Sequence, residues 1–296
     1  MMEHSSPRSL SIVMPLYVDT PWRLDYLRKC CASLARTEIP TGVKVQWYIF
    51  DDCSPLAWDA CLVPLNHFAP TIHRLAGNRG ANSTCAEAIA AGLTMADYTV
   101  SIEMDMLVHP EWLVRLLELE RQHPDGAAWT CFNAFYHPVI ERLPDGHLRK
   151  ASLSGNLLLV GRHTWCPPAT DLAQIRAECG HKTWDWSFLH RAGVLRGRAA
   201  VYCTSPSYAQ HMGMVGASYR RGELDYDRAM DFIDDTWVER TLVPQVREVW
   251  RSAEIPLIIK GSLLLGYPKC LLKRIARPFR VPPHERVYRD EVRQSQ

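Results

Sequence analysis

The stretch Tyr98-Thr-Val-Ser-Ile-Glu103-Met-Asp105-Met-Leu-Val-His-Pro110 contains a β-branched apolar run that ends in two carboxylates. Side chains two residues apart in a strand point the same way, so Glu103 and Asp105 are expected to leave the strand end on one side. Two carboxylates in this arrangement suit Mn²⁺ or Mg²⁺, which take oxygen ligands from proteins and from substrate phosphates. The stretch therefore predicts a divalent metal site, and the plainer alternative is a solvated turn at the end of a strand.

Three more apolar segments precede this stretch, and they alternate with segments of helical spacing. The expected strands are residues 10–18, 43–50 and 71–75, and the expected helices are residues 20–34, 56–66 and 83–95. This alternation predicts a mostly parallel sheet with helices on both faces, in which ligands bind beyond the carboxyl ends of the strands. The loop with Pro15 and Tyr17, the pair Asp51-Asp52, and the metal carboxylates are all expected at that edge.

The pattern changes after residue 110. A helix to residue 121 is followed by expected strands 127–136 and 149–160, whose apolar and polar residues alternate as in antiparallel pairs. Residues 184–193 read as a helix ended by glycine, and residues 197–205 as a strand. Residues 225–250 are charged and read as helical, and the chain after residue 254 is apolar and then basic. We therefore expect a domain of residues 1–220 and a helical extension of residues 221–296 that docks on a membrane or on a second subunit.

Composition narrows the class of protein. The 296 residues are 47% hydrophobic and 22% charged, which is typical of a globular α/β protein. A net charge of +2 argues against a dedicated nucleic-acid-binding protein. The ten cysteines show no CxxC pair, so free thiols in a reducing compartment are expected. The polar N-terminus and the lack of an 18-residue apolar run predict a cytoplasmic protein, soluble or associated with the inner face of the membrane.

Six short motifs in order resemble those of the inverting GT-A glycosyltransferases of family 2, over about residues 11–216. The motifs are the first strand with Pro15 and Tyr17, Asp51-Asp52-Cys-Ser54, Asn78-Arg79-Gly80, Glu103-Met104-Asp105, Trp184-Asp185, and His211-Met-Gly213. The resemblance implies a GT-A (Rossmann-like) sheet with a smaller antiparallel region on the acceptor side. It also implies transfer of a sugar from a nucleoside diphosphate, UDP being the first expectation, to a hydroxyl of a glycan or lipid-linked glycan. The sequence departs from the family where Glu103 replaces the first aspartate of DxD and Trp184 replaces the acid beside the base.

The resemblance also implies roles for individual residues. Asp105 and His211 would bind Mn²⁺ or Mg²⁺, and Asp185 would be the catalytic base. Nucleotide-sugar contacts fall on the residues at the strand ends: Pro15, Tyr17, Asp51, Asp52, Asn78, Arg79, Glu103 and Met104.

Each of these residues has a plainer interpretation. Asp51, Asp52 and Asp185 can cap turns or helices, Arg79 can be an exposed surface arginine, and His211 can be a hydrogen-bonded core histidine. His163, Cys166, Cys179 and His181 could bind zinc, although their spacing is not standard. Two further function classes stay open, a sugar nucleotidyltransferase and a nucleotide-sugar-binding module without catalytic activity. Partners are expected to be the sugar donor and the acceptor, without nucleic acid, and an oligomer is open.

Overall fold

The protein was analysed as a computed structural model that describes residues 8–134, 137–212 and 229–233. Most of the expected extension of residues 221–296 lies outside these ranges, and so do the glycine-containing loop after Met212 and the basic segment near the C-terminus. Within the described residues, no helix has the length and apolar character needed to cross a membrane. All nine cysteines in this part of the chain are free thiols, as the sequence predicts.

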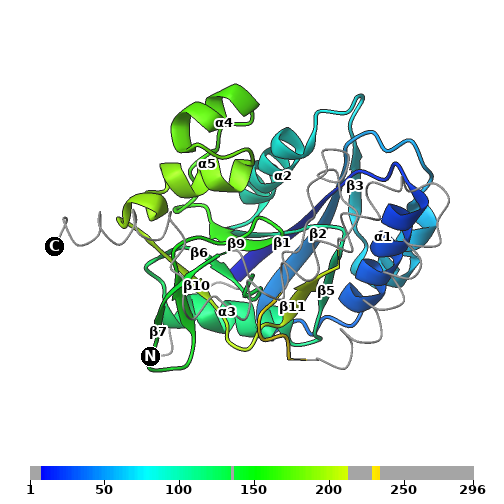
Figure 1. Ribbon diagram of the computed structural model, residues 1–296. Coiled ribbons are helices and arrows are strands. Elements are labelled where there is room, and N and C mark those ends of the chain that lie inside the picture. Colours follow the sequence, from blue (N-terminus) through cyan, green and yellow to red (C-terminus); the bar gives the residue numbers. More distant parts are fainter. Residues whose placement is uncertain (1–7, 135–136, 213–228, 234–296) are drawn as a thin grey trace, which may run out of the picture.

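One nine-stranded sheet forms the centre of the molecule (Figure 1), with strand order β3-β2-β1-β4-β9-β6-β10-β8-β7. Its strands are β1 (Arg8–Leu16), β2 (Val43–Asp51), β3 (Thr71–Arg74), β4 (Tyr98–Ile102), β6 (Gly126–Thr130), β7 (Val139–Arg142), β8 (Leu148–Lys150), β9 (Leu157–Gly161) and β10 (Ala200–Cys203). The pairs of β1 to β4 are parallel, whereas β9 and β8 are antiparallel to their neighbours. Seven strands therefore share one direction, which confirms the mostly parallel α/β sheet with an antiparallel region.

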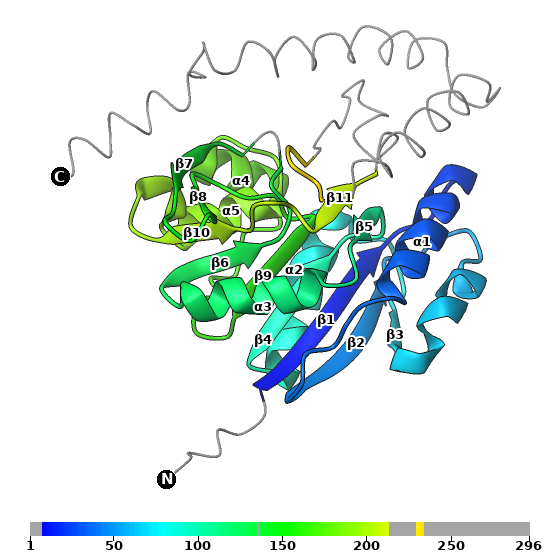
Figure 2. The same cartoon turned by 90° about the horizontal axis from the view of Figure 1, so that it is seen from below.

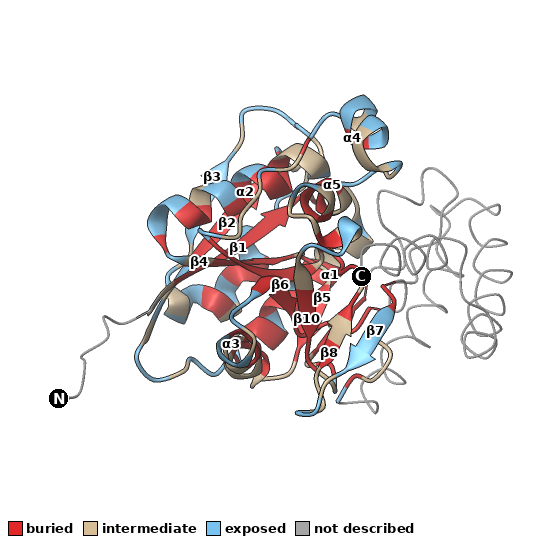
Figure 3. Ribbon diagram, turned by 90° about the vertical axis from the view of Figure 1, so that its left-hand side faces the viewer, coloured by how far each residue is buried: buried red, intermediate tan, exposed pale blue. Residues whose placement is uncertain are grey.

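Helices cover both faces of this sheet (Figure 2). The helices α1 (Pro21–Leu34) and α3 (Trp112–Gln122) and the 3₁₀ helix η1 (Asp59–Phe68) pack on one face. The helices α2 (Ala81–Met95) and α5 (Trp184–Arg191) pack on the other, and α4 (Leu172–Cys179) and the short turn η2 (Val194–Arg196) accompany α5. The period of two in β1 explains the two layers, because Ile12 and Met14 face the α1 side while Val13 faces the α2 side. Burial follows the same plan, with the central strands buried and the outer helix faces exposed (Figure 3).

A second, two-stranded sheet lies beside the main one. It pairs β5 (Met106–Val108) with β11 (Ala209–His211) in antiparallel orientation. The stretch 98–110 is thus two strands rather than one, because β4 ends at Ile102 and a turn intervenes, closed by a hydrogen bond from Met106 N–H to Glu103 O (3.3 Å). Glu103 and Asp105 lie on this turn, so the strand alternation predicted from the sequence does not explain their arrangement.

Other predicted elements differ in detail from the structure. The helix expected at 56–66 is the 3₁₀ helix η1, which contains Pro64. The strand expected at 149–160 is two strands, β8 and β9, joined by a loop of residues 151–156. Residues 229–233 lie inside the helix predicted for 225–250, yet Ala229 and Phe232 form isolated β-bridges with Ala134 and Ser207. The helix prediction, which was based on charge and helical spacing, is therefore wrong for residues 229–233, where the backbone pairs with other segments instead.

Candidate functional site

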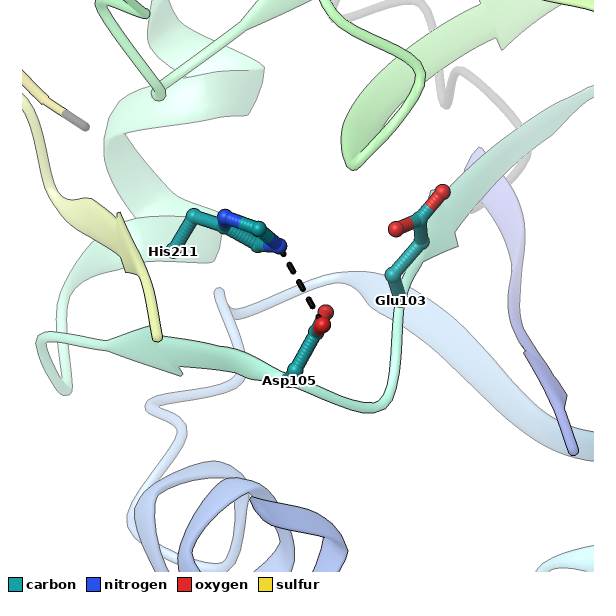
Figure 4. A group of neighbouring side chains, drawn as sticks. All are labelled: Glu103, Asp105 and His211. Carbon is teal, nitrogen blue, oxygen red and sulfur yellow. Dashed lines mark ion pairs between the residues drawn. The ribbon is translucent and has the colours of Figure 1, made fainter. Parts of the chain in front are cut away.

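Three side chains that can bind a metal meet beside the turn between β4 and β5. They are Glu103, Asp105 and His211, and one ligand atom from each lies within 4.8 Å of the others. Figure 4 shows the three side chains directed at the same space, with Asp105 and His211 joined by an ion pair. His211 Nε2 lies 3.2 Å from Asp105 Oδ2, and the two side chains are 2% and 15% exposed. Within the described residues this is the only such group, and His163, Cys166, Cys179 and His181 do not form a second one.

The small β5–β11 sheet places His211 in this group. His211 pairs with Met106 in the antiparallel register, and Met106 directly follows the turn that bears both carboxylates. His211 therefore lies beside that turn. The Met212 N–H continues the pairing by donating to Asp105 O (2.8 Å). The strand β11 was not expected from the sequence, since residues 209–211 are too few for a periodic signal. It nevertheless places the histidine where the motif order predicted it.

The Asp105 carboxyl group has a lowered pKa and spare bonding capacity. Burial tends to raise its pKa, but the charge and hydrogen bond of His211 and the charge of Arg23 outweigh burial and lower it. Its second oxygen, Oδ1, is buried and has no hydrogen-bond partner in this part of the chain. A buried carboxylate oxygen without a partner is costly unless a cation completes its bonding. Two carboxylates and one imidazole form a donor set that fits a divalent cation.

Asp51 and Asp52, at the end of β2, differ in what they bind. Asp51 accepts hydrogen bonds from Ser54 N–H (2.9 Å) and from the Trp58 indole (3.2 Å), and it pairs with Arg74 (3.4 Å). These bonds make Asp51 the cap of the turn that follows β2, which matches the plainer interpretation of this residue.

Asp52 instead joins β2 to the start of α2. Its Oδ1 accepts from Arg79 N–H (2.6 Å), and its Oδ2 accepts from Gly80 N–H (2.8 Å). Asn78 supports the same junction, because its side-chain amide donates to Asp52 O (3.2 Å). The Arg79 guanidinium is exposed and pairs with Glu87 (2.7 Å). Asn78, Arg79 and Asp52 are therefore brought together, although Arg79 bonds to Asp52 and Glu87 rather than to the metal group.

Pro15, Tyr17 and Met104 lie near the same edge in different surroundings. Pro15 is buried within β1 rather than in the loop expected from the sequence. The strand accommodates it because the pairing of β1 with β4 ends at Val13. Tyr17 is half-buried and accepts a hydrogen bond from Arg23 through its backbone oxygen (3.2 Å). The Met104 side chain is buried in the core on the α1 side.

Asp185, in the first turn of α5, is a buried carboxylate with a raised pKa. Burial is the main cause, and it outweighs the hydrogen bonds from Thr183 and from the backbone. Gly155 N–H donates to Asp185 Oδ2 (3.1 Å), and Trp186 N–H donates to Oδ1 (3.0 Å). Burial of Asp185 between α5 and the 151–156 loop is compatible with a proton acceptor, and a carboxylate in the first turn of α5 is also favoured by the helix dipole.

The acidic residues from different elements surround one buried thiol. Cys85 on α2 is buried, which raises its pKa well above the ordinary value, and Glu103, Asp185 and Asp52 add to this effect through their charges. Carboxylates from β2, the β4–β5 turn and α5 are thus close enough to interact with a single atom. The structure brings together in this way residues that are far apart in the sequence.

Arg23 and Gly155 were not identified from the sequence. Arg23 on α1 pairs with Asp19 (3.3 Å), lies 5.8 Å from the centre of the Tyr17 ring, and acts on the charge of Asp105. Gly155 permits a close approach, because a Cβ there would lie 2.8 Å from the Trp184 ring. A glycine in a loop and an arginine on a helix carry no motif, so only the packing shows their importance.

Comparisons with known proteins give structural similarities of low identity. No family model and no curated protein sequence matches the chain. Among solved structures, S. aureus TarS is 12% identical, with a TM-score of 0.46, over 86% of this chain and 42% of TarS. TarS 1-349 in complex with UDP-GlcNAc is 14% identical, with a TM-score of 0.42, over 68% of this chain and 57% of that one. GalNAc-T7 with UDP, GalNAc and Mn²⁺ is 10% identical, with a TM-score of 0.47, over 69% of this chain and 43% of that one. The chain thus spans about half the length of these proteins.

Proposed function

We propose that the protein is a metal-dependent glycosyltransferase that moves a sugar from a nucleoside diphosphate, UDP in the first instance, to a hydroxyl group with inversion. The observation that supports it most is the pairing of two acidic centres at one edge of the sheet. One is the group of Glu103, Asp105 and His211, which suits a cation. The other is the buried Asp185, whose pKa is raised. Together with the order of the six motifs, these centres match the two requirements of the reaction, a stabilised leaving group and a base.

Asp105 and His211 would hold the metal ion, and Glu103 would complete the set directly or through water. The unpartnered Asp105 Oδ1 is the feature of this chain that fits such an ion. The imidazole nitrogen favours Mn²⁺ over Mg²⁺, which prefers oxygen ligands throughout. When bound, the ion supplies positive charge that stabilises the diphosphate leaving group.

Asp185 would act as the base. It takes the proton from the acceptor hydroxyl while the acceptor oxygen forms a bond to the anomeric carbon of the donor sugar. The bond from that carbon to the diphosphate oxygen breaks at the same time, and the nucleoside diphosphate leaves with the electron pair. A carboxylate whose pKa is raised by burial holds a proton better than an ordinary aspartate, which suits this role.

The strand-end residues would bind the nucleotide. Asp52, with Asn78 and Arg79, shapes the start of α2, and Tyr17 would lie against the base. Asp51, Pro15 and Met104 would contribute by supporting these loops, because their side chains are buried. The helix start beyond Gly80 offers backbone N–H groups that suit a phosphate.

The acceptor side is the least constrained part of this proposal. A glycan or a lipid-linked glycan is the proposed acceptor, and the basic residues after residue 254 would bring the protein to an anionic membrane surface. We retain residues 1–220 as the catalytic unit and 221–296 as the docking extension. Peripheral attachment to the inner face of the membrane follows from this arrangement.

The test is a donor panel of UDP-, GDP- and dTDP-sugars, assayed for nucleotide release with and without Mn²⁺. We expect one donor to release its nucleoside diphosphate, with stimulation by Mn²⁺ and loss of activity in EDTA. Release of pyrophosphate from a sugar phosphate and a nucleoside triphosphate would point instead to a nucleotidyltransferase. Binding of UDP by calorimetry without turnover of any donor would indicate a binding module without catalytic activity.

A further inference from the structure

Three aromatic side chains that the proposed reaction does not use lie beside Asp185. We call His137, His181 and Trp186 the aromatic cluster. The rings of His181 and Trp186 stack with centroids 3.6 Å apart and planes 4° apart, and His137 lies 5.7 Å from Trp186 at 28°. Trp186 follows the proposed base directly in α5, whereas His137 and His181 come from loops far apart in the sequence. The cluster is therefore formed only by the fold.

The loop of residues 151–156 links this cluster to the base and to the metal group in order along the chain. Asn156 O accepts from Glu103 N–H (2.8 Å), Gly155 N–H donates to Asp185 Oδ2 (3.1 Å), and the Ser152 hydroxyl bonds to His137 Nδ1 (2.8 Å). One end of the loop therefore contacts the metal group, the other end contacts the aromatic cluster, and the residue between them contacts the proposed base. Three residues of extended chain span about 10 Å, so the cluster is within one or two sugar rings of the base.

The surroundings of Trp186 distinguish it from the tryptophans that serve packing. Trp58, Trp112 and Trp129 are 0–1% exposed in the core, and the half-buried Trp22 and Trp165 pack against the two core clusters, whereas the half-buried Trp186 belongs to neither cluster. His181 is also half-buried, while His137 is buried and held by its bond to Ser152. An amphipathic ring surface that is partly open to solvent is characteristic of a ligand site rather than of a core.

We propose that the aromatic cluster is the acceptor subsite and binds a pyranose ring of a glycan, with Trp186 and His181 as the stacking surface. A pyranose has a flat C–H face that packs on such rings, and its hydroxyl groups can bond to the half-buried His181 imidazole. The buried His137 and Ser152 support the rings from behind. Inversion requires the acceptor oxygen to approach from the side opposite the diphosphate, and the cluster lies on the side of Asp185 away from the metal group along the loop. This inference rests on the proposed function, and it names the residues that would bind the acceptor, which no sequence motif identifies.

The first experiment measures binding to the full chain. Methyl pyranosides of glucose, galactose, N-acetylglucosamine and mannose are titrated while the histidine imidazole resonances are followed by NMR, with assignment from His137→Gln and His181→Gln. Glycerol is the matched polyol without a ring. We expect at least one pyranoside to shift the His137 and His181 resonances in a saturable way, with no effect of glycerol. If no pyranoside moves them, or glycerol moves them equally, the inference is wrong.

The second experiment separates acceptor binding from donor binding. For Trp186→Leu, the KM for the acceptor should rise about fivefold, since one aromatic contact is worth about 1 kcal/mol. The Kd for UDP, measured by calorimetry, should not change. Phe68→Leu is the matched control, because Phe68 is also half-buried and stacks on Trp47 at a distant place, η1. An unchanged acceptor KM in Trp186→Leu would overturn the subsite.

The two proposals fail in different ways. If no donor is turned over but a pyranoside shifts the cluster, the proposed function fails while the sugar site stands. If a donor is turned over with Mn²⁺ and no pyranoside reaches the cluster, the proposed function stands and the acceptor subsite fails.

Discussion

The two halves of the sheet contribute residues to the site in different ways. Strands β1 to β4 are parallel and present residues at their carboxyl ends, so Asp51, Asp52 and the β4–β5 turn meet at one edge. The half from β9 to β7 is mixed, and it contributes the 151–156 loop, the first turn of α5 and the strand β11. The first half thus supplies the carboxylates of the metal group, and the second supplies the proposed base and the histidine ligand.

This difference teaches that the two halves depend on different physical constraints. In a parallel sheet, the edge at the carboxyl ends is fixed by topology, so strand ends identify a site. In the mixed half, the loops determine which side chains reach the site. The position of Asp185 there depends on close packing against Gly155 rather than on the order of the strands. Changes in the two halves should therefore have separable effects on donor and acceptor steps.

Asp105→Ala is expected to have the largest effect. Loss of the firmer metal ligand should lower kcat by about 10³-fold or more, because the cation stabilises the leaving group by several kcal/mol. Nucleotide release from the best donor, measured over a range of Mn²⁺ concentrations, tests this. The matched control is Asp97→Ala, an exposed aspartate just before β4, at the end of that strand far from the metal group. Full activity of Asp105→Ala would contradict the proposed role of Asp105 as a metal ligand.

Asp185→Asn tests the second half with an isosteric change. The amide cannot take the acceptor proton, so kcat for transfer should fall about 10²-fold or more, as is usual for a general base. Calorimetric binding of UDP should be unaffected, since Asp185 is proposed to contact the acceptor rather than the nucleotide. If transfer continues at the wild-type rate, Asp185 only stabilises the first turn of α5.

The pH profile should show the raised pKa of Asp185 directly. Since the base must be ionised, the rate falls as pH drops through its pKa, and burial moves this fall above the pKa of an ordinary aspartate. We expect kcat/KM to decline about tenfold per pH unit on the acid side of that midpoint. A midpoint at the ordinary aspartate value would contradict the assignment. Circular dichroism at each pH excludes acid unfolding as the cause.

Two glycines allow a direct comparison of the halves. A Cβ at Gly155 would lie 2.8 Å from the Trp184 ring and 3.1 Å from Asp185 Cβ, and a Cβ at Gly92 would lie 2.6 Å from Thr99 Oγ1. Both alanine variants should lose about 1–3 kcal/mol of unfolding free energy, measured by urea denaturation. Only Gly155→Ala should also lower kcat, because it displaces the proposed base. If Gly155→Ala and Gly92→Ala lose the same activity for the same loss of unfolding free energy, Gly155 has a purely structural role.

The smallest expected effect is that of Glu103→Asp. The shorter carboxylate still reaches the cation through water, so kcat should stay within a few-fold of the wild type, with a weaker apparent affinity for Mn²⁺. Metal titration of the reaction rate measures this. A loss as large as that of Asp105→Ala would show that Glu103 is a direct ligand of equal weight.

Much of the parallel half follows from sequence pattern, because apolar runs of 5–9 residues at regular spacing determine strands and the helices between them. The helix expected at 56–66 became a 3₁₀ helix, since Pro64 lies inside it and lacks the N–H that an α-helix uses. In the mixed half, β8 and β11 have three residues each, which is too short for periodicity to show. The segment 229–233 is extended because Asp231 accepts hydrogen bonds from Asn133, Ser205 and Ser207, a tertiary network that no local pattern announces.

The residues of the candidate site also divide into those that a sequence motif predicts and those that only the packing reveals. Glu103, Asp105 and His211 lie together, and Asp52 instead joins the end of β2 to the start of α2, whereas the proposed acceptor residues have no motif. Arg79 illustrates the limit of a motif, since its backbone N–H takes part in the Asp52 junction while its side chain pairs with Glu87. Which atoms of a motif residue reach the site is decided by packing rather than by residue identity.

The pairing of β5 with β11 has a consequence for synthesis on the ribosome. His211 follows Asp105 by 106 residues (211 − 105), so the two halves of the cation site leave the exit tunnel at different times. At about 5–20 residues per second, roughly 5–20 s pass between them. During that interval the nascent chain holds two acidic side chains but no histidine beside them. A cation site made of these residues can therefore be complete only after most of residues 1–220 have been synthesised.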